Sequence, residues 1–326
     1  MNIMEFLKNK FTNRSIIFPE GQERNIIHAA YLARQKGICR PWLVGDNRVI
    51  GQVCATLDIP AEGWYTGMSP EEDDLSGCIA QLTAEGMNES VAEFLLNQPL
   101  YYAAMMVRTG KADAMVAGFV AESGEVINAA AMMVGLAEGV SSPSSYFLFE
   151  IPDFLGREGN MLVYADCGLQ IEPTEEQLAD IAVLTARSVH NLLGWEPRVA
   201  MLSFSTKGSA EHPRSERVQN ALAIARQKAP RLLIDGEMQA DAALSMNVAE
   251  KKIPGGSPVA GQANILIFPD LDAGNIAYKL TQRLTGGTAY GPILQGFKKP
   301  VCDLSRGSSV EDILGVTSIA AVMQCL

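Results

Sequence analysis

The chain has 326 residues, which is long enough for one large domain or for two domains of about 150 residues each. Its 26 basic and 37 acidic residues give a formal charge of −11, which argues against a general nucleic-acid-binding surface, because such a surface needs a basic stripe. No stretch approaches the ~18 consecutive apolar residues of a membrane span. Residues 1–11 lack the apolar core of a secretory signal and are predicted to form a short amphipathic helix. We therefore expect a cytoplasmic protein without a membrane or nucleic-acid partner.

The cysteines and histidines show no metal-binding pattern. No two cysteines form a C-x-x-C pair, and no two of the three histidines stand at i, i+4 spacing, so a zinc signature is absent from the sequence. Scattered cysteines in a chain of this size are typical of a reducing cytosol. The six cysteines are Cys39, Cys54, Cys78, Cys167, Cys302 and Cys325.

Short apolar runs alternate with longer segments of helical periodicity along the chain. The first strand is predicted over residues 15–18, and a helix is predicted over residues 22–36 and ends before Gly37. Near-continuous apolar runs that alternate with helices are typical of parallel sheets covered on both faces, so we expect an α/β fold. The further predicted strands are residues 42–44, 114–117, 199–203, 232–234 and 265–268.

Two clusters of turn-forming residues divide the chain. Residues 141–145 read Ser-Ser-Pro-Ser-Ser, and residues 286–292 read Gly-Gly-Thr-Ala-Tyr-Gly-Pro. The roughly 35 residues after the second cluster are too few for a domain of their own and must join one already built. We therefore expect a discontinuous domain I of residues 1–140 plus 291–326, and a domain II of residues 141–290.

The strongest local pattern is residues 302–312, which read Cys-Asp-Leu-Ser-Arg-Gly-Ser-Ser-Val-Glu-Asp. Ser308 and Ser309 each stand three residues before a carboxylate, which is the spacing of a capping box, so a helix is predicted to begin here. A helix start offers free N–H groups to phosphate, and the guanidinium of Arg306 matches phosphate in two-point contact. The spacing alone favours a purely structural role for both residues. Arg306 would then make a surface ion pair, and Asp312 would only complement the helix dipole.

Two further polar segments follow predicted strands. Residues 203–210 read Ser-Phe-Ser-Thr-Lys-Gly-Ser-Ala and could cradle an anion, although a polar loop with an N-cap serine explains them equally well. Residues 235–241 carry three carboxylates that could bind a metal or transfer protons, but we favour a helix start with solvated charges. The P-loop, the nicotinamide fingerprint and the serine hydrolase elbow are all absent from the sequence.

Taken together, these segments resemble the phosphate acetyltransferases. The resemblance implies two α/β domains with parallel-type sheets flanked by helices, as in isocitrate dehydrogenase, and an active-site cleft between the domains. It also implies a homodimer without metal or a permanently bound cofactor, which converts acetyl-CoA and inorganic phosphate reversibly to acetyl phosphate and coenzyme A. Residues 1–160 match the family more loosely than the rest of the chain. The blocks that carry the resemblance are residues 198–210, 234–243, 256–264, 268–276 and 303–307.

The same resemblance implies roles for individual residues. Ser305 and Arg306 would bind the acyl phosphate and stabilise charge, and Asp312 would take the proton from the coenzyme A thiol. A base helps because a thiol with a pKa near ~8.5 is mostly protonated at neutral pH. A fixed arginine can stabilise the carbonyl oxygen as sulfur attacks. The expected substrate-binding residues are Ser205, Thr206, Lys207, Gly208, Ser209, Asn128, Asn275 and Gly307.

One segment departs from the family pattern. Residues 122–128 read Glu-Ser-Gly-Glu-Val-Ile-Asn where the family usually reads Ser-Thr-Ala-Asp-Val-Leu-Arg, so Asn128 replaces an arginine and Glu122 adds negative charge. A second expected arginine is also missing, and Thr83 falls closest to its place. Each lost charged hydrogen bond costs about 1.5–3 kcal/mol of binding.

The departure leaves other functions open. One alternative is transfer of a longer acyl group such as butyryl, and another is a weakened relative that binds acetyl-CoA or acyl phosphate without turnover. A metal-dependent dehydrogenase on the same fold has support only from the carboxylates of residues 235–241.

Overall fold

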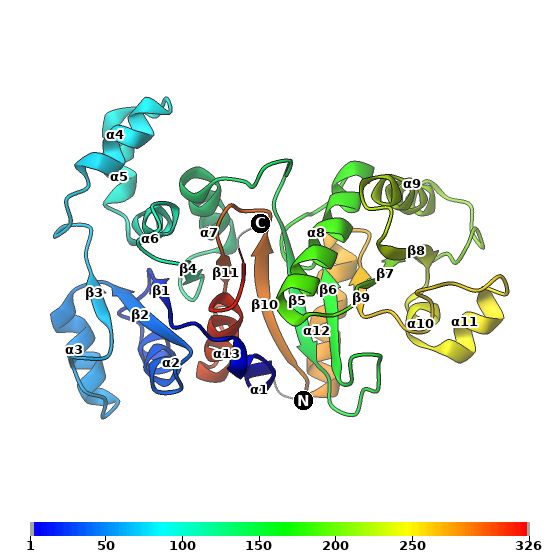
Figure 1. The fold of residues 1–326 in the computed structure, drawn as a ribbon, viewed down its shortest axis with the longest axis horizontal. Helices are drawn as coiled ribbons and strands as arrows, with labels where there is room; N and C mark the ends of the chain where they lie inside the picture. The colour runs from blue at the N-terminus through cyan, green and yellow to red at the C-terminus, as the bar shows by residue number, and fades with distance from the viewer. Residues whose placement is uncertain (1–2, 325–326) are drawn as a thin grey trace. The chain divides into compact units, whose positions relative to one another are not determined.

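Contacts within the chain divide it into two units, each built on a sheet flanked by helices (Figure 1). The computed structural model describes residues 3–324. We call Phe6–Glu138 with Phe297–Leu326 the outer unit, and Met1–Glu5 with Gly139–Gly296 the inserted unit. The α/β class predicted from the alternating apolar runs is confirmed.

The outer unit holds a fully parallel sheet in the order β3-β2-β1-β4-β11. The predicted strands over residues 15–18, 42–44 and 114–117 all form, because each is an apolar run that the sheet buries. The strands are β1 (Arg14–Phe18), β2 (Cys39–Val44), β3 (Thr66–Met68), β4 (Ala114–Ala117) and β11 (Val301–Asp303).

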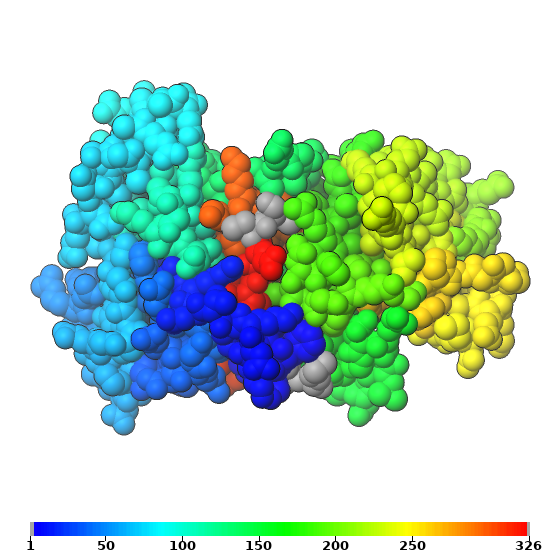
Figure 2. Space-filling view, viewed as in Figure 1, coloured from blue at the N-terminus to red at the C-terminus, as the bar shows by residue number. Residues whose placement is uncertain are grey.

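Helices of the outer unit pack on this sheet. The predicted helix over residues 22–36 forms as α2 (Arg24–Gln35) and contacts α13 (Val310–Ala320), while α6 (Pro99–Arg108) and α13 both contact β4. Helices α4 and α5 extend away from the sheet as an arm (Figures 1 and 2). The remaining helical elements are η1 (Lys8–Lys10), α3 (Asn47–Thr56), α4 (Ser76–Ala84), α5 (Glu89–Leu96), α7 (Ser123–Ala129) and η2 (Ala130–Val134).

The N-terminal helix is shorter than the segment that predicted it. It forms as α1 (Ile3–Leu7), and Met1 and Asn2 of the predicted segment lie outside the described residues. None of the helices within residues 3–324 is long and apolar enough to cross a membrane.

The inserted unit has a mixed sheet in the order β10-β5-β6-β9-β7-β8. Strands β6, β9, β7 and β8 run parallel, but β5 is antiparallel to both β10 and β6. The predicted strands over residues 199–203, 232–234 and 265–268 form as β7, β8 and β9. The bounds are β5 (Ser144–Glu150), β6 (Met161–Ala165), β7 (Arg198–Leu202), β8 (Leu233–Met238), β9 (Ile265–Ile267) and β10 (Thr288–Gln295).

The two antiparallel strands run through the clusters that the sequence marked as turns. Ser144 and Ser145 are buried in β5, where the backbone N–H and the hydroxyl of Ser145 donate to the carboxylate of Asp166. Strand β10 passes through the second cluster with a change of register between Tyr290 and Ile293. Turn-forming residues are tolerated there because buried hydroxyls find partners and a bulge absorbs the irregular backbone.

Helices and an aromatic core complete the inserted unit. Tyr164 lies between Phe149 and Phe268, with ring centroids 4.6 and 5.1 Å away. The long helix α8 starts with a capping box between Thr174 and Gln177 and packs on α9. The helices are α8 (Glu175–Leu193), α9 (Pro213–Lys228), α10 (Ala240–Leu244), α11 (Met246–Lys252) and α12 (Leu271–Thr285).

Candidate functional site

Three neighbouring strands of the outer unit end at one edge of its sheet. Strand β4 pairs in parallel with β1 on one side and with β11 on the other, where Asp303 lies opposite Ala117. Ligands of open α/β sheets bind beyond the carboxyl ends of such strands. The loops that follow these strands carry Glu20, Glu122 and the predicted residues Ser305, Arg306 and Gly307.

Ser305, Arg306 and Gly307 form an exposed turn just before α13. The N–H of Ser308 donates to the carbonyl of Ser305 at 2.9 Å. The Arg306 guanidinium lies 3.7 Å from the carboxylate of Glu122, and the two side chains are 69% and 73% exposed. An ion pair this exposed contributes at most about 1 kcal/mol. Arg306 therefore stays accessible to an anion while it is paired with Glu122.

Asp312 is tied into the start of α13. The capping box joins Ser309 with Asp312, and the alternative box at Ser308 does not form, because Ser308 is buried and its N–H closes the preceding turn. Asp312 Oδ2 accepts the Ser309 N–H at 2.9 Å and the Ser309 hydroxyl at 2.8 Å. Its Oδ1 makes no hydrogen bond within the described part of the chain. One oxygen of Asp312 thus holds the helix start, while the other receives no hydrogen bond from the described residues.

The positions of the two missing arginines are occupied by neutral side chains. Asn128 is exposed near the end of α7, the helix that Glu122 begins through a capping box with Glu125. The Thr83 hydroxyl donates to the carbonyl of Ile79 in its own helix. Neither residue replaces the lost positive charge.

The predicted anion loop of the inserted unit is bound to the neighbouring strand β8. Ser205 is fully buried, and its hydroxyl donates to Glu237 Oε1 at 2.8 Å, while the Gly208 N–H donates to the same oxygen at 2.7 Å. Lys207 Nζ donates to Asp235 Oδ1 at 2.5 Å and to the carbonyl of Gly236 at 2.7 Å. These polar groups hold the loop in place.

Thr206 and Ser209 complete the internal network of this loop. The Thr206 N–H donates to the Ser209 hydroxyl at 3.0 Å, and the Ser209 N–H donates to the carbonyl of Thr206 at 3.1 Å. Thr206 Oγ1 also accepts the N–H of Gln239 at 3.0 Å. The backbone N–H groups from Ser205 to Ser209 are thus occupied by the protein itself.

The interpretation of residues 235–241 as solvated charges is wrong for two of the three carboxylates. Asp235 and Glu237 are only 4% and 2% exposed, because β8 extends through Met238 and carries them into the sheet. Burial raises the pKa of Asp235, but the hydrogen bonds from Lys207 and Ser257 outweigh it, so this pKa lies below its usual value. Only Asp241 behaves as expected, with an exposed ion pair to Lys252.

A cavity of about 420 Å³ opens beside this loop in the inserted unit. Phe204 exposes its ring there, and Arg214 and Arg217 project from the start of α9. Arg217 pairs with Glu172 at 3.5 Å, while its Nε is buried without a hydrogen bond among the described residues. The sequence did not predict Arg214 and Arg217 as site residues, and it included Phe204 only as part of the candidate loop 203–210. Pro213 could have predicted the start of a helix after the strand of residues 199–203, and therefore that Arg214 and Arg217 lie in the first turns of that helix.

Asn275 lies in the second turn of α12 (Leu271–Thr285), and its side-chain amide donates to the carbonyl of Cys167 at 3.2 Å. The neighbouring Gly274 allows this close approach, since a Cβ there would come within 2.3 Å of the Asp166 carbonyl. Asn275 therefore anchors α12 to the turn after β6.

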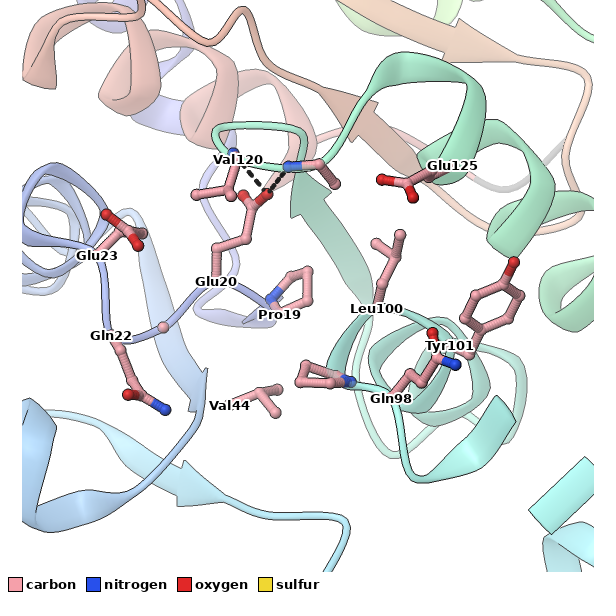
Figure 3. A pocket seen from close by; sticks show the side chains of 13 residues that line it. Pro19, Glu20, Gln22, Glu23, Val44, Gln98, Leu100, Tyr101, Val120 and Glu125 are labelled. Carbon is pink, nitrogen blue, oxygen red and sulfur yellow. Dashed lines mark hydrogen bonds between the residues drawn. The ribbon is translucent and has the colours of Figure 1, made fainter. Parts of the chain in front are cut away.

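A second cavity, of about 530 Å³, lies in the outer unit at the ends of β1, β2 and β4 (Figure 3). Its walls include Gln98, Leu100 and Tyr101, and its charged lining residues are the carboxylates of Glu20, Glu23 and Glu125, without an arginine, lysine or histidine. Sequence analysis missed this cavity and Glu20. Pro19 and Glu20 directly follow the predicted strand of residues 15–18, and this position could have predicted a polar side chain at the edge of the sheet.

No metal centre is arranged within residues 3–324, where no three His, Cys, Asp or Glu side chains gather as ligands. The cysteines at positions 39, 54, 78, 167 and 302 are free thiols, and Cys325 lies outside the described residues. Burial raises the pKa of Cys39 to about 12, although Arg34 lowers it in part, so this thiol is not a nucleophile at neutral pH.

Comparison with known proteins places this α/β architecture among phosphotransacylases. The profile of the phosphate acetyl/butaryl transferase family matches residues 2–321. The chain therefore belongs to this family. It is 43% identical over 311 residues to the phosphate acetyltransferase of Acetivibrio thermocellus, covering 95% of this chain and 93% of the relative.

Solved structures show the same relationship. A phosphotransacetylase from Streptococcus pyogenes superposes with a TM-score of 0.90 at 36% identity, covering 98% of this chain and 97% of the other. A 4-hydroxythreonine-4-phosphate dehydrogenase from Klebsiella pneumoniae shares only the fold, with a TM-score of 0.56 and 12% identity over 96% of this chain and 99% of the other.

Proposed function

We propose that this chain is a phosphate acetyltransferase, which converts acetyl-CoA and inorganic phosphate reversibly to acetyl phosphate and coenzyme A. The observation that carries the proposal is the exposed turn of Ser305, Arg306 and Gly307 at the start of α13, with Oδ1 of Asp312, which receives no hydrogen bond from the described residues, in the first turn of the same helix. Membership of the family supports it over the other functions left open by the sequence.

The proposed chemistry is direct transfer between sulfur and phosphate. In the direction of acetyl-CoA synthesis, the coenzyme A thiol gives its proton to Asp312 Oδ1, and the thiolate attacks the carbonyl carbon of acetyl phosphate. A carbon–sulfur bond forms, and the bond between the carbonyl carbon and the oxygen that bridges to phosphorus breaks. Inorganic phosphate leaves with the electron pair of that bond. Arg306 and the N–H groups at the start of α13 stabilise the charge on the oxygens, with Ser305 and Gly307 holding the phosphate.

We propose the cavity beside residues 203–204 as the site for part of coenzyme A. The exposed ring of Phe204 can stack on a base, and Arg214 and Arg217 can pair with phosphate groups. The predicted residues Ser205, Thr206, Lys207, Gly208 and Ser209 would then act by shaping this cavity, since their polar groups are already bonded within the protein. Asn275 would act in the same way by fixing α12, and Asn128 would contact the phosphate end.

A homodimer is part of this proposal. Ile276, Leu280 and Leu284 follow one another at helical i, i+4 spacing and are 57%, 53% and 79% exposed along α12. An apolar helix stripe of this kind fits against a second copy of itself across a twofold axis. We also propose a cytoplasmic location, which free thiols in the described residues support.

The test is enzymatic turnover. Purified protein mixed with acetyl phosphate and coenzyme A should consume free thiol, and adding inorganic phosphate to acetyl-CoA should release it. Arg306→Ala is the matched control, because Arg306 is exposed and its loss should leave the fold intact. Turnover no greater than that of Arg306→Ala would reject the proposed function.

A further inference from the structure

The β4–α7 loop, residues 118–122, is contacted by carboxylates from two other strand ends. Glu20 reaches it from the end of β1, and Asp303 reaches it from the end of β11. Strands β1 and β11 lie on either side of β4 in the parallel sheet, so the two carboxylates approach the loop from opposite sides. The same loop ends at Glu122, the partner of Arg306.

Glu20 accepts three successive backbone N–H groups of this loop. The N–H of Phe119 donates to Oε2, and those of Val120 and Ala121 both donate to Oε1, each at 2.8 Å. Figure 3 shows the Glu20 carboxylate directly at the loop that carries Val120. Consecutive N–H groups that converge in this way form an anion-binding nest. Here the anion is supplied by the protein itself, and it fixes the conformation of the loop.

Asp303 packs against the beginning of the same loop. Its side chain is fully buried, and both carboxylate oxygens lack a hydrogen-bond partner among the described residues. A Cβ at Gly118 would come within 1.9 Å of Asp303 Oδ1, so only glycine lets the loop pass. Burial raises the pKa of Asp303 to about 7, with a further rise from Glu20. The three loop N–H groups donate to Glu20 and none of them donates to Asp303, so Glu20 supplies the acceptor that fixes the loop.

We propose that Glu20 is a positioning residue of the transfer reaction, which acts through the β4–α7 loop to place Glu122 and thereby the Arg306 guanidinium. This inference rests on the proposed function for its kinetic consequences. The bond network itself does not depend on that function, because every contact in it lies within the outer unit.

Glu23 provides the matched control. It lines the same cavity as Glu20, but its side chain makes no hydrogen bond at the helix start where it lies. Glu23→Gln and Glu20→Gln thus remove the same charge from the same cavity, and only the second disturbs the loop. Glu20→Asp, which keeps the charge but shortens the side chain, serves if Glu20→Gln does not fold.

The experiment measures kcat and KM for acetyl phosphate and coenzyme A. We expect Glu20→Gln to lower kcat/KM for acetyl phosphate about three- to fivefold, the loss that an exposed ion pair can transmit, with the KM for coenzyme A unchanged and Glu23→Gln within about twofold of the wild type. In an Arg306→Ala background, the Glu20→Gln change should cost almost nothing more, because the two residues act through one path. An equal loss in both backgrounds, or activity of Glu20→Gln within twofold of the wild type, would overturn the inference.

A structural readout separates this inference from the proposed function. Backbone amide signals of residues 119–121 and the Arg306 Nε–H signal should shift in Glu20→Gln and not in Glu23→Gln. If the wild type shows no turnover, the proposed function fails, and a shifted Arg306 signal still supports the positioning path. An unchanged Arg306 signal overturns the path whether or not the enzyme turns over.

Discussion

Arg306 lies 3.7 Å from Glu122, so the arginine proposed to meet the phosphate rests on a carboxylate of its own unit. The pair is exposed on both sides, and its net contribution to stability is small. Glu122 is thus the carboxylate that orients the Arg306 guanidinium at the start of α13.

Removing this partner should loosen Arg306 and weaken phosphate binding. We expect Glu122→Gln to raise the KM for inorganic phosphate about two- to fivefold, since an exposed pair is worth up to about 1 kcal/mol. The effect should shrink as salt screens the pair. Steady-state kinetics at low and high ionic strength measure it, with Glu89→Gln as a control carboxylate on the separate helix α5. A lowered KM would show that Glu122 competes with phosphate for Arg306.

The two contacts of Asp312 can be separated by mutation. Asp312→Asn should lower kcat by about 10²- to 10⁴-fold, because it removes the proposed base. Ser309→Ala removes the helix cap and should cost about 1 kcal/mol of stability, while it lowers kcat far less. Thermal unfolding together with kcat distinguishes the two roles. Equal activity losses in the two variants would mean that Asp312 only caps α13.

Restoring the missing cation should raise activity. Asn128→Arg returns a positive side chain to the exposed end of α7. A charged hydrogen bond worth about 1.5–3 kcal/mol corresponds to roughly 10- to 150-fold in affinity for acetyl phosphate or phosphate. The inhibition constant of inorganic phosphate and the KM for acetyl phosphate both measure this change in affinity, and Asn128→Gln is the neutral control. No difference between the two variants would place residue 128 outside the substrate site.

Asp303 should make stability depend on pH in an unusual direction. Its pKa is raised by burial to about 7 in the fold, from 3.8. The folded state therefore holds a proton that the unfolded chain releases, and stability falls as pH rises from about 4 through about 7. Asp303→Asn should remove this loss, up to about 4 kcal/mol from a shift of roughly three pH units. Urea unfolding of both proteins between pH 5 and pH 8 measures it, and parallel pH curves would contradict the prediction.

The apolar stripe of α12 predicts the oligomeric state. Leu280→Glu places a charge in the middle of the stripe and should convert the proposed homodimer to a monomer. Light scattering coupled to size-exclusion chromatography gives the mass. Lys279→Glu, one residue away on the same helix, is the charge control and should leave the mass unchanged. A monomeric wild type would remove the homodimer from the proposal.

Several elements could be predicted because local pattern and tertiary environment agree. Residues 114–117 are apolar throughout, and β4 buries all four. The start of α13 was limited to two positions, because a serine three residues before a carboxylate is a local signal. By contrast, β5 was not predicted, since Ser144 and Ser145 read as a turn until Asp166, 21 residues further on, supplies the partner that allows Ser145 to be buried.

The candidate site shows the same difference. By itself, the sequence determined the α/β class and limited the start of the last helix to Ser308 or Ser309. It also determined the family resemblance that assigns roles to Ser305, Arg306 and Asp312. All of these rest on patterns of residues that are close together in the chain. Only the tertiary structure decided that Glu122 partners Arg306, that Asp235 and Glu237 are buried, and that Glu20 holds the β4–α7 loop. Each of those contacts joins residues at least 28 positions apart in the sequence. Lys207 and Asp235 are 28 positions apart, and Glu20 and Ala121 are 101 positions apart. No local pattern carries such pairs, because their geometry is set by which strands lie side by side.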